Sequence, residues 1–235
     1  MYDIIGDVHG YAPLLKNLLI GLGYQKSESG YYHPERKAIF VGDFINRGPE
    51  IRKTIRIIRA MVENGNAFAI LGNHEINAII YYLKFKKEDP LAKAPRKYFF
   101  ALFKTIEEFT RHSEELIDHL KWLRTLPLFL DMEGFRVVHA CLSQEAVDFL
   151  KKEISEGKIK KRMFREMIQN PKSDFSKHIW TLTKGIDFKM PGDLKLINNK
   201  GVSPRSFRIR WWENPLGKTF EELSFDSKFI LPSYD

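Results

Sequence analysis

The feature that most constrains this fold is a unit of strand, glycine and helix that occurs three times early in the chain. Short apolar runs at 2–5, 38–41 and 67–71 each lead directly into a glycine, and a helix-like segment follows each turn. The turns are spaced by roughly 30 to 36 residues, the length that a βαβ unit requires. Three such units predict a mainly parallel β-sheet covered by helices on both faces. The first helix is expected to bury one face formed by Leu14, Leu15, Leu18, Leu19 and Leu22.

The middle of the chain is predicted to be helical and then to form a hairpin. The helical pattern extends from about residue 75 to 126, with a break at 88–95. Apolar runs at 127–130 and 135–141 flank the turn "DMEG", which predicts two antiparallel strands.

The last part of the chain is predicted to be helical first and loop-rich later. Residues 144–170 predict two basic helices interrupted at Gly157, and a strand is expected within "SFRIRWWE" at 206–213. No segment has the composition of a linker. We therefore predict a single domain over residues 1–235, with a helical insertion at roughly 81–125.

Composition narrows the class of protein. Hydrophobic residues make up 43% of the chain and aromatic residues 13%, which supports one sizeable core. No signal peptide is recognisable, and no apolar run approaches the roughly 20 residues of a membrane helix. The single cysteine, Cys141, excludes an intrachain disulfide. A cytoplasmic location without a membrane partner is expected from these three observations.

The charge leaves two interpretations open. The net charge is +8 and the sequence pI is near 9.4. One interpretation is an anionic partner such as a phosphate ester, a nucleotide or a nucleic acid. The other is an ordinary basic protein, because net charge determines solubility and association rather than activity.

Side chains that bind metals follow four of the predicted strands. The six residues are Asp7, His9, Asp43, Asn73, His74 and His139. Because ligands collect outside the carboxyl ends of the strands in open α/β sheets, we expect these side chains to converge. Carboxylate, imidazole and amide donors favour Mn, Fe, Zn or Ni over a site built from thiolates. Such a set can hold two divalent ions with one aspartate between them, the usual arrangement for activating water against a phosphoryl group.

Four ordered motifs resemble those of one known family. They are "GDVHG" at 6–10, "GDFINRGP" at 42–49, "GNHE" at 72–75 and "VVHA" at 137–140. Together they resemble the calcineurin-like metallophosphoesterases, in particular the branch of serine/threonine protein phosphatases and bacterial diadenosine-tetraphosphate hydrolases. The resemblance extends over roughly residues 1–140. It implies a four-layer α-β-β-α sandwich of the α/β class with a dinuclear site.

The resemblance also implies a role for each side chain. The implied metal ligands are Asp7 and His9 for one ion, Asn73 and His139 for the other, and Asp43 as the bridge. The expected cofactors are two divalent ions, manganese first, with iron, zinc or nickel as alternatives. His74 would protonate the leaving oxygen, while Arg47 and Asn73 would contact the substrate phosphate. A guanidinium fork suits phosphate oxygens, and an imidazole needs only a modest pKa shift to act near pH 7.

The sequence departs from the family pattern at two places. Asn46 stands where an aspartate usually orients the catalytic histidine. A neutral amide cannot stabilise an imidazolium by charge, so Asn46 predicts a weaker acid at His74 or a substrate with a better leaving group. The late Gly-His motif that normally supplies one more ligand is also missing. Either His178 or Asp187 replaces it, or the chain stops before that motif.

Three basic features have weaker interpretations. Arg210 is expected to add a phosphate contact from the strand at 206–213, although a half-buried strand explains the same pattern. The stretch 83–104 is interpreted as an amphipathic helix rather than a lid over the substrate. The run 158–165 is interpreted as a solvated helix face first and as a binding surface for polyanions second.

The leading hypothesis is a metal-dependent phosphoesterase. It would hydrolyse phosphomonoesters or nucleotide-type phosphoanhydrides with water activated at the dinuclear site. Its partner would be a phosphorylated small molecule, nucleotide or phosphoprotein; nucleic acid is left open, and the oligomeric state is not predicted. The alternative is a catalytically weak or silent relative that binds phosphorylated or nucleic-acid partners through the same pocket, an idea motivated by Asn46 and the missing late histidine.

Overall fold

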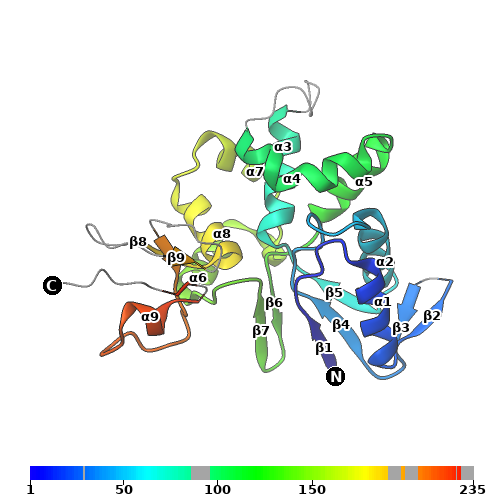
Figure 1. Ribbon diagram of the computed structural model, residues 1–235, viewed down its shortest axis with the longest axis horizontal. Coiled ribbons are helices and arrows are strands. Elements are labelled where there is room, and N and C mark those ends of the chain that lie inside the picture. The colour runs from blue at the N-terminus through cyan, green and yellow to red at the C-terminus, as the bar shows by residue number, and fades with distance from the viewer. Residues whose placement is uncertain (29, 86–95, 190–196, 199–205, 226, 229–235) are drawn as a thin grey trace.

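A three-stranded parallel sheet forms the centre of the molecule (Figure 1). The structure is a computed structural model that describes residues 1–28, 30–85, 96–189, 197–198, 206–225 and 227–228. The sheet has the order β1 (Tyr2–Ile5), β4 (Lys37–Phe40) and β5 (Ala67–Ala69). Ile4 lies opposite Ile39, which lies opposite Phe68 on the next strand. The predicted strands and their parallel pairing are confirmed, and the central strand is the most deeply buried, as expected for a sheet covered on both faces.

Helices α1 (Ala12–Gly21) and α2 (Ile51–Glu63) cover one face of this sheet. In α1 the buried stripe runs through Ala12, Leu15 and Leu19, at the spacing of one helical face. Leu14 and Leu18 remain 63% and 46% exposed. The prediction that all five leucines share the buried face is therefore wrong, because α1 docks with the face of Leu15 and Leu19 toward the core and the preceding positions point about 100° away from it. A small hairpin follows α1, with strands β2 (Gln25–Ser27) and β3 (Gly30–Tyr32).

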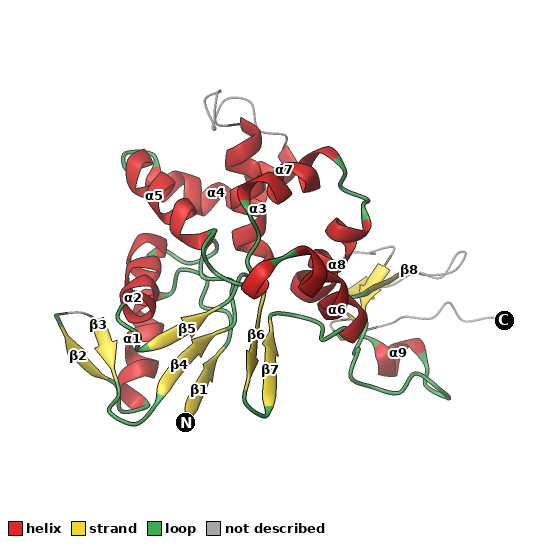
Figure 2. Cartoon of the chain, turned by 180° about the vertical axis from the view of Figure 1, so that it is seen from behind, coloured by secondary structure: helices red, strands yellow, loops and turns green. Residues whose placement is uncertain are grey.

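The predicted hairpin covers the opposite face of the sheet. Its strands are β6 (Phe129–Met132) and β7 (Phe135–Val138). Ile39, Ile70 and Val137 form a small buried cluster between the sheet and this hairpin. Beyond the hairpin lie α6 (Gln144–Glu153) and α8 (Asp174–Lys184), which pack against each other. Figure 2 shows the layers side by side, from α1 and α2 through both sheets to α6 and α8. The predicted α/β class and α-β-β-α sandwich are confirmed.

Four helices gather at the carboxyl-end side of the strands, at the top of Figures 1 and 2. They are α3 (Asn73–Phe85), α4 (Arg96–Phe109), α5 (Ser113–Leu123) and α7 (Lys161–Gln169). The predicted break at 88–95 lies outside the described residues. In α4 the buried side chains are Leu102, Thr105, Ile106 and Phe109, while Phe103 and Lys104 are exposed. Residues 86–95 lie outside the described residues and the side chains of 96–101 are not described, so the interpretation of 83–104 as an amphipathic helix stays a prediction.

The remaining elements are short. A single 3-10 turn at Ser155–Gly157 separates α6 from α7, where Gly157 predicted an interruption. The others are β8 (Asp187–Lys189), β9 (Ile197–Asn198), β10 (Ser206–Arg208), α9 (Phe220–Leu223) and β11 (Ser227–Lys228). The strand predicted within 206–213 is thus present over its first three residues. Among the described helices, none is long and apolar enough to cross a membrane. The division into one domain with an insertion at 81–125 stays a prediction.

Candidate metal centre

The side chains predicted to bind metal lie where the strands end. β1 leads into Asp7 and His9, β4 into Asp43, and β7 into His139, while β5 leads into Asn73 at the start of α3. The first two loops are tied together by their backbones, since the His9 N–H donates to the Asp43 carbonyl at 2.9 Å. The parallel sheet thereby brings to one edge residues that are far apart in the sequence.

Two groups of ligand atoms share Asp43. One group is His9, Asp43 and His74, and the other is Asp7, Asp43 and His139; within each, the ligand atoms lie within 4.8 Å of one another. The Asp43 side chain is buried, with Oδ1 at 3.6 Å from His139 Nε2 and Oδ2 at 3.7 Å from His9 Nε2. Its two oxygens therefore face different histidines, as a bridging ligand requires. Asp7 belongs to the group with His139, whereas the resemblance implies that Asp7 and His9 bind the same ion. Asp7 is also close to His9, because its Oδ2 lies 3.5 Å from His9 Nε2.

Two histidines are held in the tautomer that a metal ligand needs. His9 Nδ1 donates to the Ile45 carbonyl at 2.9 Å, and His139 Nδ1 donates to the Val41 carbonyl at 2.7 Å. A carbonyl oxygen only accepts, so in each neutral ring Nε2 carries the free lone pair. His9 Nε2 is buried and has no hydrogen-bond partner in the described structure. His139 Nε2 faces the Asn73 Oδ1 at 3.3 Å, an approach of two acceptors that a cation between them would stabilise.

His74 is held in the opposite way. Its Nδ1 lies 2.7 Å from the Asn46 Nδ2. The Asn46 Oδ1 accepts from the Thr105 hydroxyl at 2.5 Å, and the Thr105 Oγ1 accepts from the Asn46 backbone N–H at 3.2 Å. Thr105 thus fixes the amide so that its NH2 group donates to His74, which leaves the proton of the neutral imidazole on Nε2. His74 Nε2 lies 3.8 Å from Asp43 Oδ2, so this N–H faces the same centre.

Glu75 binds the backbone of the loops that carry the centre, and it was not identified as a site residue from the sequence. The side chain is fully buried. Its Oε1 accepts from the N–H groups of Phe44 and Ile45 at 2.8 and 3.3 Å, and its Oε2 accepts from those of Asp43 and Gly72 at 2.8 and 3.1 Å. Burial and the Asp43 charge raise the pKa of Glu75 to about 7, against the lowering effect of these N–H groups. The last letter of "GNHE" was the only signal for it in the sequence.

The loop that carries Asp43 is tightly folded. Four of the five described non-glycine residues with positive φ lie at this site: His9, Asp43, Asn46 and Arg47, with φ between 45° and 69°. Such conformations are uncommon outside glycine and concentrate at functional sites. Gly72 lies so close to Asp43 that a Cβ atom there would collide with the carboxylate. Only a residue without a side chain therefore lets the backbone come this close to the carboxylate.

Burial and charges at the centre shift the pKa values of Asp7, His9 and His74. The close approach of the His9 ring, with Nε2 3.5 Å from Asp7 Oδ2, lowers the pKa of Asp7, and His139 and Arg47 lower it further. Burial disfavours the charged form of His9, but the Asp7 carboxylate and the Ile45 carbonyl together raise its pKa. Burial lowers the pKa of His74, and the charges of His9 and Arg47 act in the same direction. The exposed Arg47 therefore lies near enough to act on the centre electrostatically, as a phosphate-binding side chain should.

Other predicted residues lie outside this centre. His178 packs its ring on Phe149 with centroids 4.5 Å apart, and Asp187 is exposed on β8; neither belongs to a group of metal-binding side chains in the described structure. The exposed Arg210 has no described contact with the cluster. Its neighbour Trp211 donates from Nε1 to the carbonyl of Ala140 at 2.7 Å, one residue after His139, so this segment lies beside the centre.

The comparison with protein families agrees with this geometry. Residues 2–203 match the family described as calcineurin-like phosphoesterase. The chain belongs to this family. The match includes every residue of the centre described above, and it extends the resemblance beyond the first 140 residues.

Similar proteins support the same assignment. An asymmetrical bis(5'-nucleosyl)-tetraphosphatase PrpE from Oceanobacillus iheyensis is 45% identical over 73 residues, which is 31% of this chain and 29% of that protein. A symmetrical bis(5'-nucleosyl)-tetraphosphatase from a Marinomonas species is 34% identical over 167 residues, which is 67% of this chain and 51% of that protein. The matched segments thus span from under a third to about half of these relatives. A cold-active protein-tyrosine phosphatase of a psychrophilic Shewanella species has a TM-score of 0.50 at 14% identity, over 78% of this chain and 54% of that one, and shows the fold alone.

Proposed function

We propose that this chain hydrolyses phosphate esters or nucleotide-type phosphoanhydrides at a dinuclear metal site. The observation that carries the proposal is the position of Asp43, whose two carboxylate oxygens face histidines from different loops. A buried carboxylate among imidazoles is costly unless cations or hydrogen bonds compensate it. Membership of the calcineurin-like phosphoesterases supports the same class of chemistry.

The donor set suits divalent cations. The unpaired Nε2 of His9 and the facing acceptors of His139 and Asn73 are the atoms that an ion would satisfy. The proposed ligands are Asp7, His9, Asp43, Asn73 and His139. When bound, two such ions would polarise phosphate oxygens and lower the pKa of a water molecule. Mixed oxygen and imidazole ligands fit manganese, which we take as the first metal to test, before iron, zinc and nickel.

The remaining side chains would bind and protonate the substrate. Arg47 is exposed beside the centre, and its guanidinium would hold phosphate oxygens through paired N–H bonds. His74 presents Nε2–H toward Asp43 and would give this proton to the leaving oxygen. Asn46 would position the His74 ring, and Thr105 would fix the Asn46 amide. Arg210 is proposed as a second phosphate contact because its neighbour Trp211 is anchored beside the centre.

The names of the relatives suggest the first substrate to test. Both of the relatives described above are named bis(5'-nucleosyl)-tetraphosphatases, one asymmetrical and one symmetrical. We therefore propose a dinucleoside polyphosphate ahead of a phosphoprotein or a phosphorylated oligonucleotide. The two names differ in the position of cleavage, so they do not favour either product pattern.

The decisive experiment combines metal analysis with turnover of an aryl phosphate in added manganese. Two ions per chain and measurable turnover are expected, and Asp43→Asn should lose metal and activity together. His74→Asn should retain metal but lose most turnover, about 10²–10⁴-fold for a missing proton donor. Asp148→Asn, an exposed aspartate on α6, is the matched control and should behave as the parent protein. A folded protein with neither metal nor turnover would overturn the proposal. A panel of diadenosine tetraphosphate, phosphopeptides and 5'-phosphorylated oligonucleotides then selects the substrate.

A second candidate function is binding without efficient catalysis. It is favoured by Asn46, whose NH2 group donates to His74 and so opposes the formation of an imidazolium. In this case the metal-loaded protein would bind phosphopeptides or phosphorylated oligonucleotides at its centre but turn none of them over. Turnover of any member of the panel that Asp43→Asn abolishes would exclude this alternative.

A further inference from the structure

A separate cavity lies between three helices of the upper layer. It has a volume of about 210 Å³ and is lined by residues of α3, of α5 and its C-cap, and of α7, none of which belongs to the metal centre. Its α3 residues, Ile79 to Leu83, lie six to ten positions after Asn73, which is about 9–15 Å along the helix axis. The cavity is thus a different site from the proposed hydrolytic centre, although one helix joins the two.

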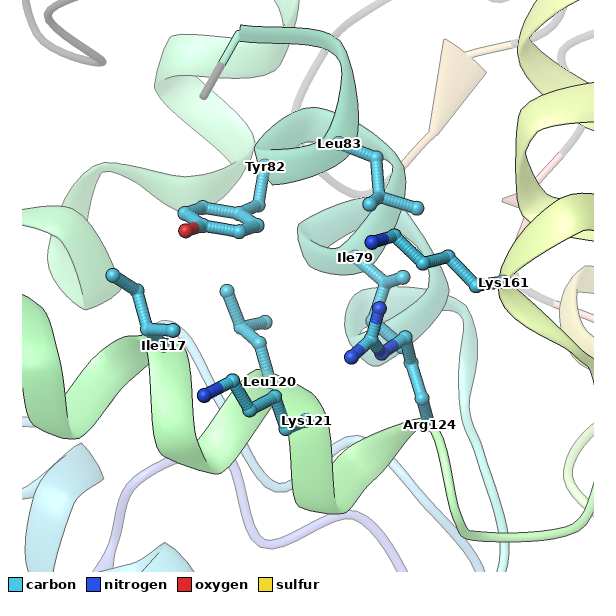
Figure 3. A pocket seen from close by; sticks show the side chains of 8 residues that line it. All are labelled: Ile79, Tyr82, Leu83, Ile117, Leu120, Lys121, Arg124 and Lys161. Atoms are coloured by element: carbon cyan, nitrogen blue, oxygen red, sulfur yellow. The ribbon is translucent and has the colours of Figure 1, made fainter. Parts of the chain in front are cut away.

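One side of this cavity is apolar and includes a flat ring. Its lining side chains are Ile79, Tyr82 and Leu83 from α3 and Ile117 and Leu120 from α5. Figure 3 shows the Tyr82 ring above Ile117 and Leu120, with open space between them. Tyr82 is only partly buried, so a face of its ring is accessible to a ligand. A planar heteroaromatic group can stack on such a ring whatever its hydrogen-bonding pattern.

The other side of the cavity is cationic. Lys121 and Arg124 line it from α5 and its C-cap, and Lys161 lines it from the start of α7; Figure 3 shows the Lys161 amine and the Arg124 guanidinium turned toward each other, with the Lys121 amine on the other side of Leu120. No carboxylate lines the cavity in the described structure, and the side chains of Lys121 and Arg124 form no ion pair with described residues. The positive charges of Lys121 and Arg124 lie beside one apolar space, and an anion bound there would be attracted by both.

The cationic side continues into a second hollow. This hollow, of about 580 Å³, shares Lys121, Arg124 and Lys161 with the first and adds Lys158 and Lys160. Its one carboxylate, Glu156, is already engaged by Lys158 at 2.8 Å. In the run 158–165, interpreted from sequence first as a solvated face, Lys158, Lys160 and Lys161 are exposed and line this open hollow. The room for negative charge exceeds one phosphate and suits a chain of two or three.

We propose that this pair of hollows binds a nucleoside di- or triphosphate. The base would stack on Tyr82 against Ile117 and Leu83, and the phosphates would lie among Lys121, Arg124 and Lys161, toward Lys158. An apolar wall beside several cations matches a ligand with a ring at one end and charge at the other. A nucleic acid strand would instead need a long open track of cations and repeated stacking platforms.

The test is calorimetric titration of the full chain with two probes. One probe is a non-hydrolysable ATP analogue, and the other is inorganic tripolyphosphate. Arg124→Ala and Lys121→Ala are each expected to lower the affinity for both probes about tenfold or more, because each removes a charge-assisted hydrogen bond. Tyr82→Ala should lower the affinity for the ATP analogue about tenfold and leave the affinity for tripolyphosphate unchanged. Lys152→Ala removes one exposed positive charge from α6 and should change neither affinity.

Three results would overturn the proposal. The first is ATP-analogue binding that Arg124→Ala and Lys121→Ala leave intact, or no binding by the parent protein. The second is equal affinity for the two probes with no effect of Tyr82→Ala, which would make this a plain anion site. The third is tighter binding of single-stranded oligonucleotides that grows with length and falls steeply with salt, which would make it a nucleic-acid surface. Urea midpoints establish that each variant is folded, and Lys121→Gln serves as the milder variant where an alanine unfolds the protein.

Discussion

Glu108 on α4 caps a helix to which it does not belong. Its carboxylate accepts from the first two N–H groups of α2, at Ile51 with 2.7 Å and at Arg52 with 3.0 Å. The residue in the N-cap position of α2 itself, Glu50, makes no capping bond with its side chain. Replacing Glu108 by alanine therefore removes the acceptor for two N–H groups of the first turn and a negative charge at the positive end of the helix.

The magnitude follows from these contacts. Loss of a side-chain cap costs about 0.5–2 kcal/mol, and loss of a favourable charge at a helix N-terminus adds about 0.3–1 kcal/mol. Glu108 supplies two bonds and is half-buried, so we expect Glu108→Ala to reduce the free energy of unfolding by about 1.5–3 kcal/mol. For a protein of this size the melting temperature should fall by roughly 3–12 °C. Glu108→Gln keeps one acceptor oxygen, so its melting temperature should lie between those of the parent protein and of Glu108→Ala.

Urea unfolding followed by circular dichroism measures this difference. Glu107→Ala is the matched control, because Glu107 is the exposed neighbour on α4 and contacts only Lys104 at 3.1 Å among described residues. Its unfolding free energy should stay within about 0.5 kcal/mol of the parent. The slope of the unfolding free energy against urea concentration should be the same in both variants as in the parent protein. Equal midpoints for Glu108→Ala and Glu107→Ala would refute the capping role.

Three further predictions concern the centre and one helix contact. Asn46→Asp should raise turnover of alkyl phosphates about tenfold or more, because a charged hydrogen bond to His74 is stronger by over 1 kcal/mol; an unchanged or lower rate in a kinetic assay contradicts this. Glu75→Gln leaves two of four buried N–H groups without an acceptor, whichever way its amide points. Urea unfolding should therefore show a free energy of unfolding that is lower by about 2–6 kcal/mol. Glu114→Gln, at an exposed position in the first turn of α5, is the control and should change this free energy by under about 0.5 kcal/mol. Burial raises the pKa of Glu115, but Arg52 and Arg56 outweigh it and lower this pKa below its usual value. The contribution of Glu115 to stability is therefore complete above about pH 4.5 and is lost as the pH falls through the lowered pKa. The urea midpoints of the parent and of Glu115→Gln should differ at pH 7 and coincide near pH 3, and a difference that grows in acid would contradict this.

The sequence was sufficient for the parts of the fold that depend on local pattern. The three strands, the hairpin at β6 and β7, and the helices around Gly157 follow from apolar runs and turn residues that lie side by side in the chain. The strand ends then located Asp7 and Asp43 by topology, because parallel strands share one carboxyl edge, and His139 follows β7 of the hairpin that packs on this sheet.

The supporting residues could not be found in the same way. Thr105 meets Asn46 from 59 positions away, and Glu108 meets Ile51 from 57 positions away. Thr105 is buried on the apolar side of α4 and Glu108 lies half-buried at its edge, and neither residue type is unusual for an amphipathic helix. Their roles depend on how α4 is docked against α2, which is a matter of packing between distant segments. The exposure of Leu14 and Leu18 has the same origin, since only the docked position of α1 decides which leucines face the sheet.

The three histidines of the centre differ in function because different groups hold their Nδ1 atoms. A backbone carbonyl accepts the Nδ1 proton of His9 and of His139, so each turns a lone pair toward Asp43 and is suited to bind a cation. An amide NH2 donates to Nδ1 of His74, so this ring turns an N–H toward the same place and is suited to give a proton. An aspartate at position 46 would accept the Nδ1 proton instead, and His74 would then donate from Nε2 only as an imidazolium, which is the stronger acid. In the proposed site, Asn46 would therefore keep His74 out of the ligand set even without charge, and His74 would be a weaker acid. Thr105 fixes the amide in this orientation, because its hydroxyl donates to the Asn46 Oδ1.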